Sequence, residues 1–221
     1  MKLRGIIVLA VFVLFHTAVF SQIRVACVGN SITYGAGIKD RDVNSYPAQL
    51  GKILGTEWDV KNFGVSGATL LRKGDRPYWK QAALKNAISF NPNVVIIKLG
   101  TNDSKPQNWK FKNEYFADYV AMIDTFKALP AKPMVFVCYP VPSFPGNWGI
   151  RDSIIRVDIL PQVKKVAKKT SSKIIDLYAA LSGHADLFPD KIHPNADGAG
   201  IMAKVISENL LANKKAFLKK K

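Results

Sequence analysis

Cysteine and histidine are scarce in this sequence. Its 221 residues include two cysteines and three histidines, too few for a disulfide framework, and no Cys/His cluster has the spacing of a zinc site. Beyond the N-terminus there is also no apolar stretch of about 20 residues, the length that a membrane-spanning helix needs. These absences exclude a disulfide-stapled scaffold, a zinc finger and a protein with several membrane spans.

Acidic residues are few as well, since 16 Asp and Glu stand against 32 Lys and Arg, giving a net charge of +16. What the sequence does have is apolar material: 48% hydrophobic and 10% aromatic residues, enough for a substantial core and too much for a disordered chain. A basic surface attracts anions in general, such as nucleic acid, acidic glycans or anionic lipid. A merely solvated basic surface fits this composition equally well.

The first 21 residues have the pattern of a secretory signal peptide. Lys2 and Arg4 precede an apolar run from Ile6 to Phe15, and small residues follow up to Ser21. We therefore expect cleavage after Ser21 and an exported protein, periplasmic or extracellular, which counts against a nucleic-acid partner. The alternative is a retained membrane anchor, but His16 interrupts the run short of the length of a span. We expect no stable membrane insertion after cleavage.

Short apolar runs alternate with helical patterns along the rest of the chain. This alternation predicts a three-layer α/β/α domain with a parallel sheet over residues 22–212, followed by a solvated basic tail, residues 213–221. The predicted strands are Ile23–Val28, Asp59–Phe63, Asn93–Leu99, Met134–Tyr139 and Lys173–Leu177. The predicted helices are Ser45–Leu54, Tyr78–Phe90, Asn113–Leu129, Ser153–Lys169 with a kink or break at Pro161, and Asn195–Ala212.

Ligands of parallel α/β sheets bind at the carboxyl ends of the strands, so the loops there should carry function. The first loop contains Ser31 directly after the first strand, where a hydroxyl can be presented at the sheet edge. The alternative for Ser31 is a turn residue or helix cap. A second serine, Ser66, nearly fits the Gly-x-Ser-x-Gly pattern, but Ala68 breaks it. Gly67 is better interpreted as a backbone N–H that approaches a ligand closely.

Two further loops complete a candidate site. Asn102 follows the third strand, where its amide can donate a hydrogen bond, although an Asx-turn is the common alternative. Near the C-terminus Asp190 stands three residues before His193, a spacing at which a tight turn brings the carboxylate to the imidazole and fixes its tautomer. His184 is the rival base, but it lacks a neighbouring acid of this kind.

Ser31, Gly67, Asn102 and the pair Asp190/His193 occur in one order, each after a predicted strand. In this order the sequence resembles the SGNH/GDSL hydrolases, a family named for its Ser, Gly, Asn and His blocks. The stretches around the first and third blocks, Gly-Asn-Ser-Ile-Thr and Lys-Leu-Gly-Thr-Asn-Asp-Ser, look like those of the sialate O-acetylesterase branch. One departure is that Asn30 stands where the family usually has an aspartate.

The resemblance implies the site's chemistry. Ser31 would be the nucleophile, His193 the base and then the acid, and Asp190 the residue that orients His193. The Ser31 N–H, the Gly67 N–H and the Asn102 side chain would form the oxyanion hole. Neither metal nor cofactor would be required, and the sheet would have five strands in the order 2-1-3-4-5.

The expected substrate is an acetylated carbohydrate, because the loops are polar, basic and aromatic. Arg72, Lys73, Trp79 and Trp109 are candidate substrate-binding residues, and Trp148 belongs to the same set of loops. Two alternatives remain: a lysophospholipase or acyl-thioesterase of the same family, which would need an apolar groove, and a non-catalytic glycan-binding protein on the same fold. The sequence does not determine the sugar or the oligomeric state.

The two cysteines are expected to be free despite the predicted export. Cys27 lies in the first strand and Cys138 in the fourth, and in the order 2-1-3-4-5 the third strand separates them. Two strand spacings amount to roughly 9–10 Å, whereas a disulfide needs Cα atoms within about 7 Å.

Overall fold

Five parallel strands form one sheet in the order β2-β1-β3-β4-β5, which confirms the expected fold class and strand order. The computed structural model describes residues 22–146 and 149–218. The predicted signal peptide and Trp148 lie outside these residues. The strands are β1 (Ile23–Gly29), β2 (Trp58–Gly64), β3 (Val94–Lys98), β4 (Met134–Cys138) and β5 (Lys173–Ile175).

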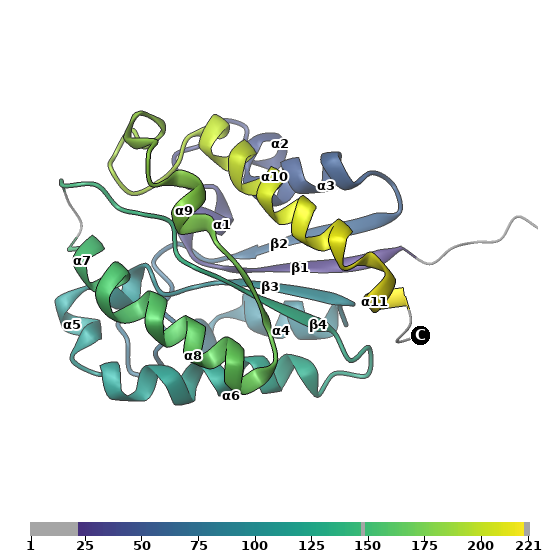
Figure 1. Ribbon diagram of the computed structural model, residues 1–221, viewed down its shortest axis with the longest axis horizontal. Helices are drawn as coiled ribbons and strands as arrows, with labels where there is room; N and C mark the ends of the chain where they lie inside the picture. The colour runs from purple at the N-terminus through teal and green to yellow at the C-terminus, as the bar shows by residue number, and fades with distance from the viewer. Residues whose placement is uncertain (1–21, 147–148, 219–221) are drawn as a thin grey trace, which may run out of the picture.

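Helices cover both faces of the sheet (Figure 1). One layer contains α3, α9 and α10, and the other contains α4, α6 and α8. Among the described residues, no helix has the length and apolar character needed to span a membrane.

The helices are α1 (Ser31–Tyr34), α2 (Arg41–Asn44), α3 (Tyr46–Leu54), α4 (Ala82–Ser89), α5 (Pro106–Trp109), α6 (Tyr115–Lys127), α7 (Asp152–Ile154), α8 (Leu160–Thr170), α9 (Leu177–Leu181), α10 (Ala196–Ala212) and α11 (Lys214–Leu218). The single turns are η1 (Tyr78–Lys80), η2 (Asn102–Ser104), η3 (Lys112–Glu114), η4 (Ile155–Ile159) and η5 (Ala185–Leu187).

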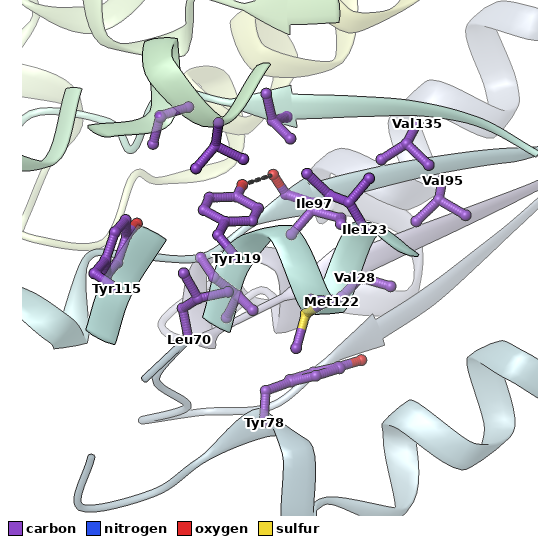
Figure 2. Packing of buried hydrophobic residues seen from close by; sticks show 14 of the residues in the cluster. Val28, Leu70, Tyr78, Val95, Ile97, Tyr115, Tyr119, Met122, Ile123 and Val135 are labelled. Atoms are coloured by element: carbon purple, nitrogen blue, oxygen red, sulfur yellow. Dashed lines mark hydrogen bonds between the residues drawn. The ribbon is translucent and has the colours of Figure 1, made fainter. Parts of the chain in front are cut away.

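The central strand β3 supplies side chains to the core on both faces. All five of its residues are buried, as the continuous β-branched run predicts for a strand covered by helices on both sides. Figure 2 shows the core on the α6 side, where Val95 and Ile97 meet Met122 and Tyr119 of α6. The Tyr119 hydroxyl donates to the carbonyl of Ile97 over 3.3 Å, so this phenol is buried with a partner.

The helix predicted over Ser153–Lys169 is interrupted before its proline. α7 leads into a wide π-type turn, η4, and α8 begins directly afterwards with Pro161 in its first turn. Proline has no N–H to donate and its ring crowds the preceding turn. The widened turn accommodates both effects, so the chain continues in the same direction instead of breaking.

The end of the chain differs from the expected solvated tail. After α10 the chain turns at Asn213 into α11, whose Phe217 is 6% exposed. The Phe217 ring packs edge-on against Trp58 and Phe136, with ring centroids 5.9 Å and 6.5 Å apart. The Lys-rich composition predicted a solvated tail here. Instead the apolar side chain of Phe217 packs against aromatic rings of the sheet.

Both cysteines are free and buried on the α3/α10 side of the sheet, as the strand order predicts. Burial raises the pKa of both thiols, that of Cys138 to about 12. The thiols are therefore protonated near neutral pH and behave as small apolar side chains.

Thiol titration tests this arrangement. The denatured, unreduced protein should react with two equivalents of a thiol reagent per chain, and the native protein with almost none, because both sulfur atoms are enclosed. A count of zero after denaturation, together with a monomer on a non-reducing gel, would contradict both the free thiols and the strand order.

Candidate active site

Ser31 is placed by a close turn at the carboxyl end of β1. The strand ends at Gly29, where a Cβ would lie 2.1 Å from Thr33 Oγ1 and 2.7 Å from the Lys98 carbonyl oxygen, so a larger residue does not fit. Asn30 then caps α1, its Oδ1 accepting from the Ile32 N–H over 3.1 Å. Ser31 is thereby fixed as the first residue of a helix, where its own N–H has no intrahelical acceptor.

A tight turn brings Asp190 against His193. Asp190 Oδ1 accepts from the N–H groups of Ile192 (3.0 Å) and His193 (2.7 Å), and Oδ2 lies 2.6 Å from His193 Nδ1. The other ring nitrogen, His193 Nε2, lies 2.8 Å from Ser31 Oγ. Residues 162 positions apart in the chain, Ser31 and His193, are thus joined in one line of hydrogen bonds from carboxylate to imidazole to hydroxyl.

The electrostatics of this line favour an ionised Asp190. Burial alone would raise the pKa of Asp190, but hydrogen bonds from the His193 side chain and from the N–H groups of His193 and Ile192 outweigh burial and lower the pKa. A carboxylate at Nδ1 holds a proton on that nitrogen, which leaves the Nε2 lone pair facing the Ser31 hydroxyl. This arrangement can remove a proton from Ser31.

A cavity of about 300 Å³ opens beside Ser31. Gly67 borders it with φ of +76°, a left-handed conformation that glycine adopts without strain. Within the described residues, neither the Ser31 N–H nor the Gly67 N–H donates to another protein group, so both are available to a ligand. The cavity is lined by Ser31, Ala36, Ser66, Gly67, Thr101, Asn102, Lys105, Ile150, Ile192 and His193.

Asn102 reaches the same cavity from η2, directly after β3. Its Nδ2 donates to the carbonyl of Ala68 over 3.0 Å, which uses one of two amide hydrogens and leaves the other for a ligand. The backbone carbonyl of Asn102 accepts from Asn108 Nδ2 over 2.8 Å. One bond therefore holds the side-chain amide and the other holds the turn that carries it, as a preorganised donor requires.

Asp103 is a residue that sequence reasoning missed. It is fully buried, and its two carboxylate oxygens accept from the N–H groups of Leu70 (3.0 Å) and Leu71 (2.8 Å). Burial raises the pKa of Asp103 to about 6, against the lowering effect of these bonds. Asp103 thus ties the loop that carries Gly67 to the turn that carries Asn102. No local pattern reveals this, because its partners are more than 30 residues away.

Lys98 was also missed. It ends β3, is completely buried, and its Nζ lies 3.2 Å from Thr101 Oγ1 and 3.4 Å from Asn30 Oδ1. A single lysine at the end of the run Val-Val-Ile-Ile-Lys is a signal that could have been followed, since a charge rarely enters a buried strand without a reason.

The predicted substrate-binding residues do not meet at Ser31. Trp109 is 6% exposed, donates from Nε1 to Asp158 Oδ2 over 2.8 Å and stacks edge-on with Tyr115. It is a core residue under α8, so its predicted role as a stacking platform is wrong. Its position in a loop gave no information on which way the ring points.

Trp79, Arg72 and Lys73 form a separate surface group. The Arg72 guanidinium lies 3.9 Å from the centroid of the Trp79 ring, and Lys73 Nζ is 2.7 Å from Glu114 Oε1. None of the three is among the described residues that line the cavity beside Ser31. The structure therefore does not bring these three residues together with Ser31, and their part in substrate binding stays a prediction.

The two rival residues are placed differently. Ser66 lines the cavity, but among the described residues the hydroxyl that hydrogen-bonds to the His193 ring is that of Ser31. His184 is exposed in the turn before η5. The described part of the chain also contains no group of three His, Cys, Asp or Glu side chains that could share a metal ion. The chemistry available at this cavity is that of a serine hydroxyl beside an oriented imidazole.

Comparison with known proteins identifies a family that matches most of the chain. The sequence profile of the GDSL-like lipase/acylhydrolase family matches residues 27–201, which include every residue of the cavity. A protein of Xylanibacter ruminicola named acetylxylan esterase is 45% identical over 203 residues. The match covers 84% of this chain and 42% of that protein, so the chain spans less than half the length of its relative.

Solved structures share the fold. A carbohydrate acetylesterase from Sinorhizobium meliloti superposes with a TM-score of 0.69 at 17% identity, over 86% of this chain and 99% of the other. An aryl esterase of M. smegmatis does so with a TM-score of 0.65 at 18% identity, over 86% and 98% of the two chains. At such identities the similarity concerns the architecture alone.

Proposed function

Because the chain belongs to the GDSL-like lipase/acylhydrolase family, we propose that it is a serine esterase that removes O-acetyl groups from carbohydrates. The observation that carries the proposal is the line of hydrogen bonds Asp190–His193–Ser31 at the mouth of a cavity. Its relative named acetylxylan esterase supports a glycan substrate and favours acetylated xylan over a sialate ester. The N-terminal signal pattern supports export, where a polysaccharide substrate would be met.

In the proposed reaction Ser31 Oγ attacks the acetyl carbonyl carbon while His193 Nε2 accepts the hydroxyl proton. The negative charge that forms on the carbonyl oxygen is stabilised by the N–H groups of Ser31 and Gly67 and by the Asn102 amide. His193 then gives its proton to the departing sugar oxygen, which leaves acetyl-Ser31. A water molecule, deprotonated by His193, then attacks the acetyl carbon of acetyl-Ser31. The bond to Ser31 Oγ breaks, His193 returns the proton to that oxygen, and acetate leaves.

The cavity suits a short acyl group. Ala36, Ile150 and Ile192 supply its apolar surface, and a volume of about 300 Å³ accommodates an acetyl group with part of a sugar ring. A lysophospholipase or acyl-thioesterase would instead hydrolyse esters of long chains faster than acetate. A release assay that compares acetylated xylan, acetylated sialic acid and 4-nitrophenyl esters of increasing chain length separates these activities.

Replacing Ser31 or His193 by alanine should lower kcat on 4-nitrophenyl acetate by more than about 10³-fold with little change in melting temperature, since each variant removes one member of a unit. The double variant should be only slightly slower than either single variant. The matched control is Ser66→Ala, which removes a neighbouring hydroxyl of the same cavity and should retain activity. A fluorophosphonate probe should label the wild type and Ser66→Ala but not Ser31→Ala. If the probe labels none of these three proteins, the protein is a non-catalytic glycan-binding protein.

Replacing Asn102 by alanine should lower kcat by about 10²–10³-fold with a smaller change in KM, since the amide interacts most strongly with the charge that develops during the reaction. Kinetics and thermal unfolding on the same preparation check this. If the variant unfolds at a lower temperature but keeps its kcat per folded molecule, Asn102 has only a structural role.

A further inference from the structure

A second cavity, of about 440 Å³, adjoins the one at Ser31. Ile150 lines both cavities, which are therefore neighbours on the protein. An acetylated polysaccharide is longer than the first cavity can hold, and its neighbouring sugar units need a surface to lie on. Both cavities are bordered by loops that follow the carboxyl ends of strands, where ligands of such sheets bind.

The two walls of this second cavity are tied to the reacting groups. On one side the N–H of Phe144 donates to the Lys191 carbonyl over 2.8 Å, which joins this wall to the turn that holds His193. On the other side Arg151 donates from its N–H to Ser104 Oγ (3.0 Å) and from Nε to the Ser104 carbonyl (2.7 Å). Ser104 belongs to η2, as does Asn102, so a ligand bound in the second cavity has a fixed position relative to the acyl site.

The side chains between these walls include a carboxylate, a guanidinium and a phenol, which can form hydrogen bonds with sugar hydroxyls. Asp152 accepts from the Ser143 N–H (3.0 Å) and from the Tyr178 hydroxyl (2.9 Å), and Arg156 Nε lies 4.0 Å from Asp152 Oδ2. Burial, then the bond to Asp152, raises the pKa of Tyr178 to about 12, so the phenol stays a donor. The Arg156 side chain is 64% exposed and has free N–H groups to offer.

Resting on the proposed function, we propose that this second cavity binds uncharged glycosyl units adjacent to the acetylated one. Its carboxylate and guanidinium pair accept from and donate to hydroxyl groups, and the rings of Phe144 and Tyr178 offer flat apolar surface. A long acyl chain would leave these polar groups without partners, which costs binding energy. The cavity therefore selects an oligosaccharide or polysaccharide over a single acetylated sugar.

The test is a ratio of two rates. For Arg156→Ala, kcat/KM on acetylated xylohexaose divided by kcat/KM on 4-nitrophenyl acetate should fall about tenfold, mainly through a higher KM, because 4-nitrophenyl acetate is too short to reach Arg156. Tyr178→Phe should lower the same ratio less. Lys168→Ala, an exposed cation on α8 outside the cavity, is the control and should leave the ratio unchanged. An unchanged ratio in Arg156→Ala would overturn the proposal.

A direct binding experiment separates this proposal from the proposed function. Unacetylated xylohexaose should bind the Ser31→Ala protein in calorimetry, and about tenfold more weakly when Arg156→Ala is added. If the wild type hydrolyses 4-nitrophenyl acetate but no acetylated xylan, the proposed substrate is wrong, and xylohexaose binding decides alone on the cavity. Absence of binding, or equal binding to both proteins, would overturn the second site.

A different observation concerns Lys98, the buried lysine at the end of β3. Within the described residues no carboxylate lies within 4.0 Å of its Nζ. Its two hydrogen-bond partners are Asn30, directly before Ser31, and Thr101, directly before Asn102. The side chain at position 30 is a neutral amide, so it offers Lys98 an acceptor oxygen but no counter-charge.

We infer that Lys98 is a positioning residue of the esterase site, joining the loop of the nucleophile to the loop of the oxyanion donor. Asn30 Oδ1 accepts hydrogen bonds both from Lys98 Nζ and from the N–H of Ile32 in the first turn of α1. Thr101 Oγ1 receives the same ammonium. A shift of Lys98 would move Ser31 and Asn102 relative to each other, and small misplacements of reacting groups slow a reaction strongly.

The cost of this arrangement is visible in the ionisation of Lys98. Burial lowers the pKa of Lys98 to about 7, while the other titratable groups on this face, Cys27, Cys138 and Tyr46, have raised pKa values and remain neutral. Between that value and the ordinary pKa of about 10.4, the unfolded chain binds a proton that the folded protein does not. The stability of the protein should therefore increase as the pH rises through this range.

Lys98→Met gives opposite effects on stability and rate. At pH 7 the variant should melt at a higher temperature than the wild type. Its melting temperature should also depend much less on pH between pH 7 and 10, because the group that causes the wild-type increase is gone. Its kcat should nevertheless fall about tenfold with little change in KM. Thermal unfolding at several pH values and kinetics on 4-nitrophenyl acetate measure this. A variant that is less stable with an unchanged kcat, or more stable with an unchanged kcat, would overturn the positioning role.

A double-mutant cycle keeps the inference testable even if one variant folds poorly. Thr101→Val removes only the hydroxyl partner and should lower kcat a few-fold by itself. Added to Lys98→Met it should have little further effect, since both changes break the same connection. Fully additive losses would mean that Lys98 and Thr101 act independently and would overturn the inference.

Discussion

The parallel pairing of β1 with β3 is the contact on which the site depends. Gly29 and Lys98 are partners at the carboxyl ends of these strands, so the loops that follow them start side by side. One loop carries Ser31 and the other Asn102. Because both strands are central in the sheet and covered by helices on both faces, the pairing cannot slip without exposing a buried row of side chains. The position of the reacting groups is therefore set by the buried centre of the sheet.

The remaining parts of the site are attached to this pair by buried polar bonds. Asp103 accepts the N–H groups that anchor the loop of Gly67, and Asp190 organises the turn of His193. In both cases one carboxylate replaces the regular hydrogen bonds that a loop lacks. A site assembled in this way is rigid although most of its residues lie outside helices and strands, and this rigidity suits chemistry that needs fixed donors.

Much of this could be predicted from the sequence because it depends on local patterns. The five strands lie close to their predicted positions, since a run such as that of β3 specifies a strand buried on both faces. The spacing of Asp190 and His193 predicted their contact, because a three-residue turn allows few geometries. The positions of Ser31, Gly67 and Asn102 followed from the rule that parallel strands present function at their carboxyl ends.

What could not be predicted depends on long-range packing. Trp109 was expected at the surface and is in the core, because its indole N–H finds Asp158, a residue 49 positions away. Arg72 and Lys73 pair with acids of α6 and its preceding turn, which no loop composition reveals. Phe217 packs against Trp58, a residue of β2 that is far away in the sequence. In each case the deciding partner is remote in sequence, so a rule based on neighbouring residues had no access to it.

The docking of α11 has a consequence for how this unit can be joined to others. Phe217 lies against Trp58 at the start of β2, Lys214 pairs with Glu57, and the Ile23 N–H that opens β1 bonds to the Glu57 carbonyl. Both ends of the described chain therefore leave from the amino edge of the sheet (Figure 1), opposite the cavity at Ser31. A module fused at either end would extend away from the reacting groups, so this architecture can be combined with carbohydrate-binding or catalytic partners without blocking access to the substrate.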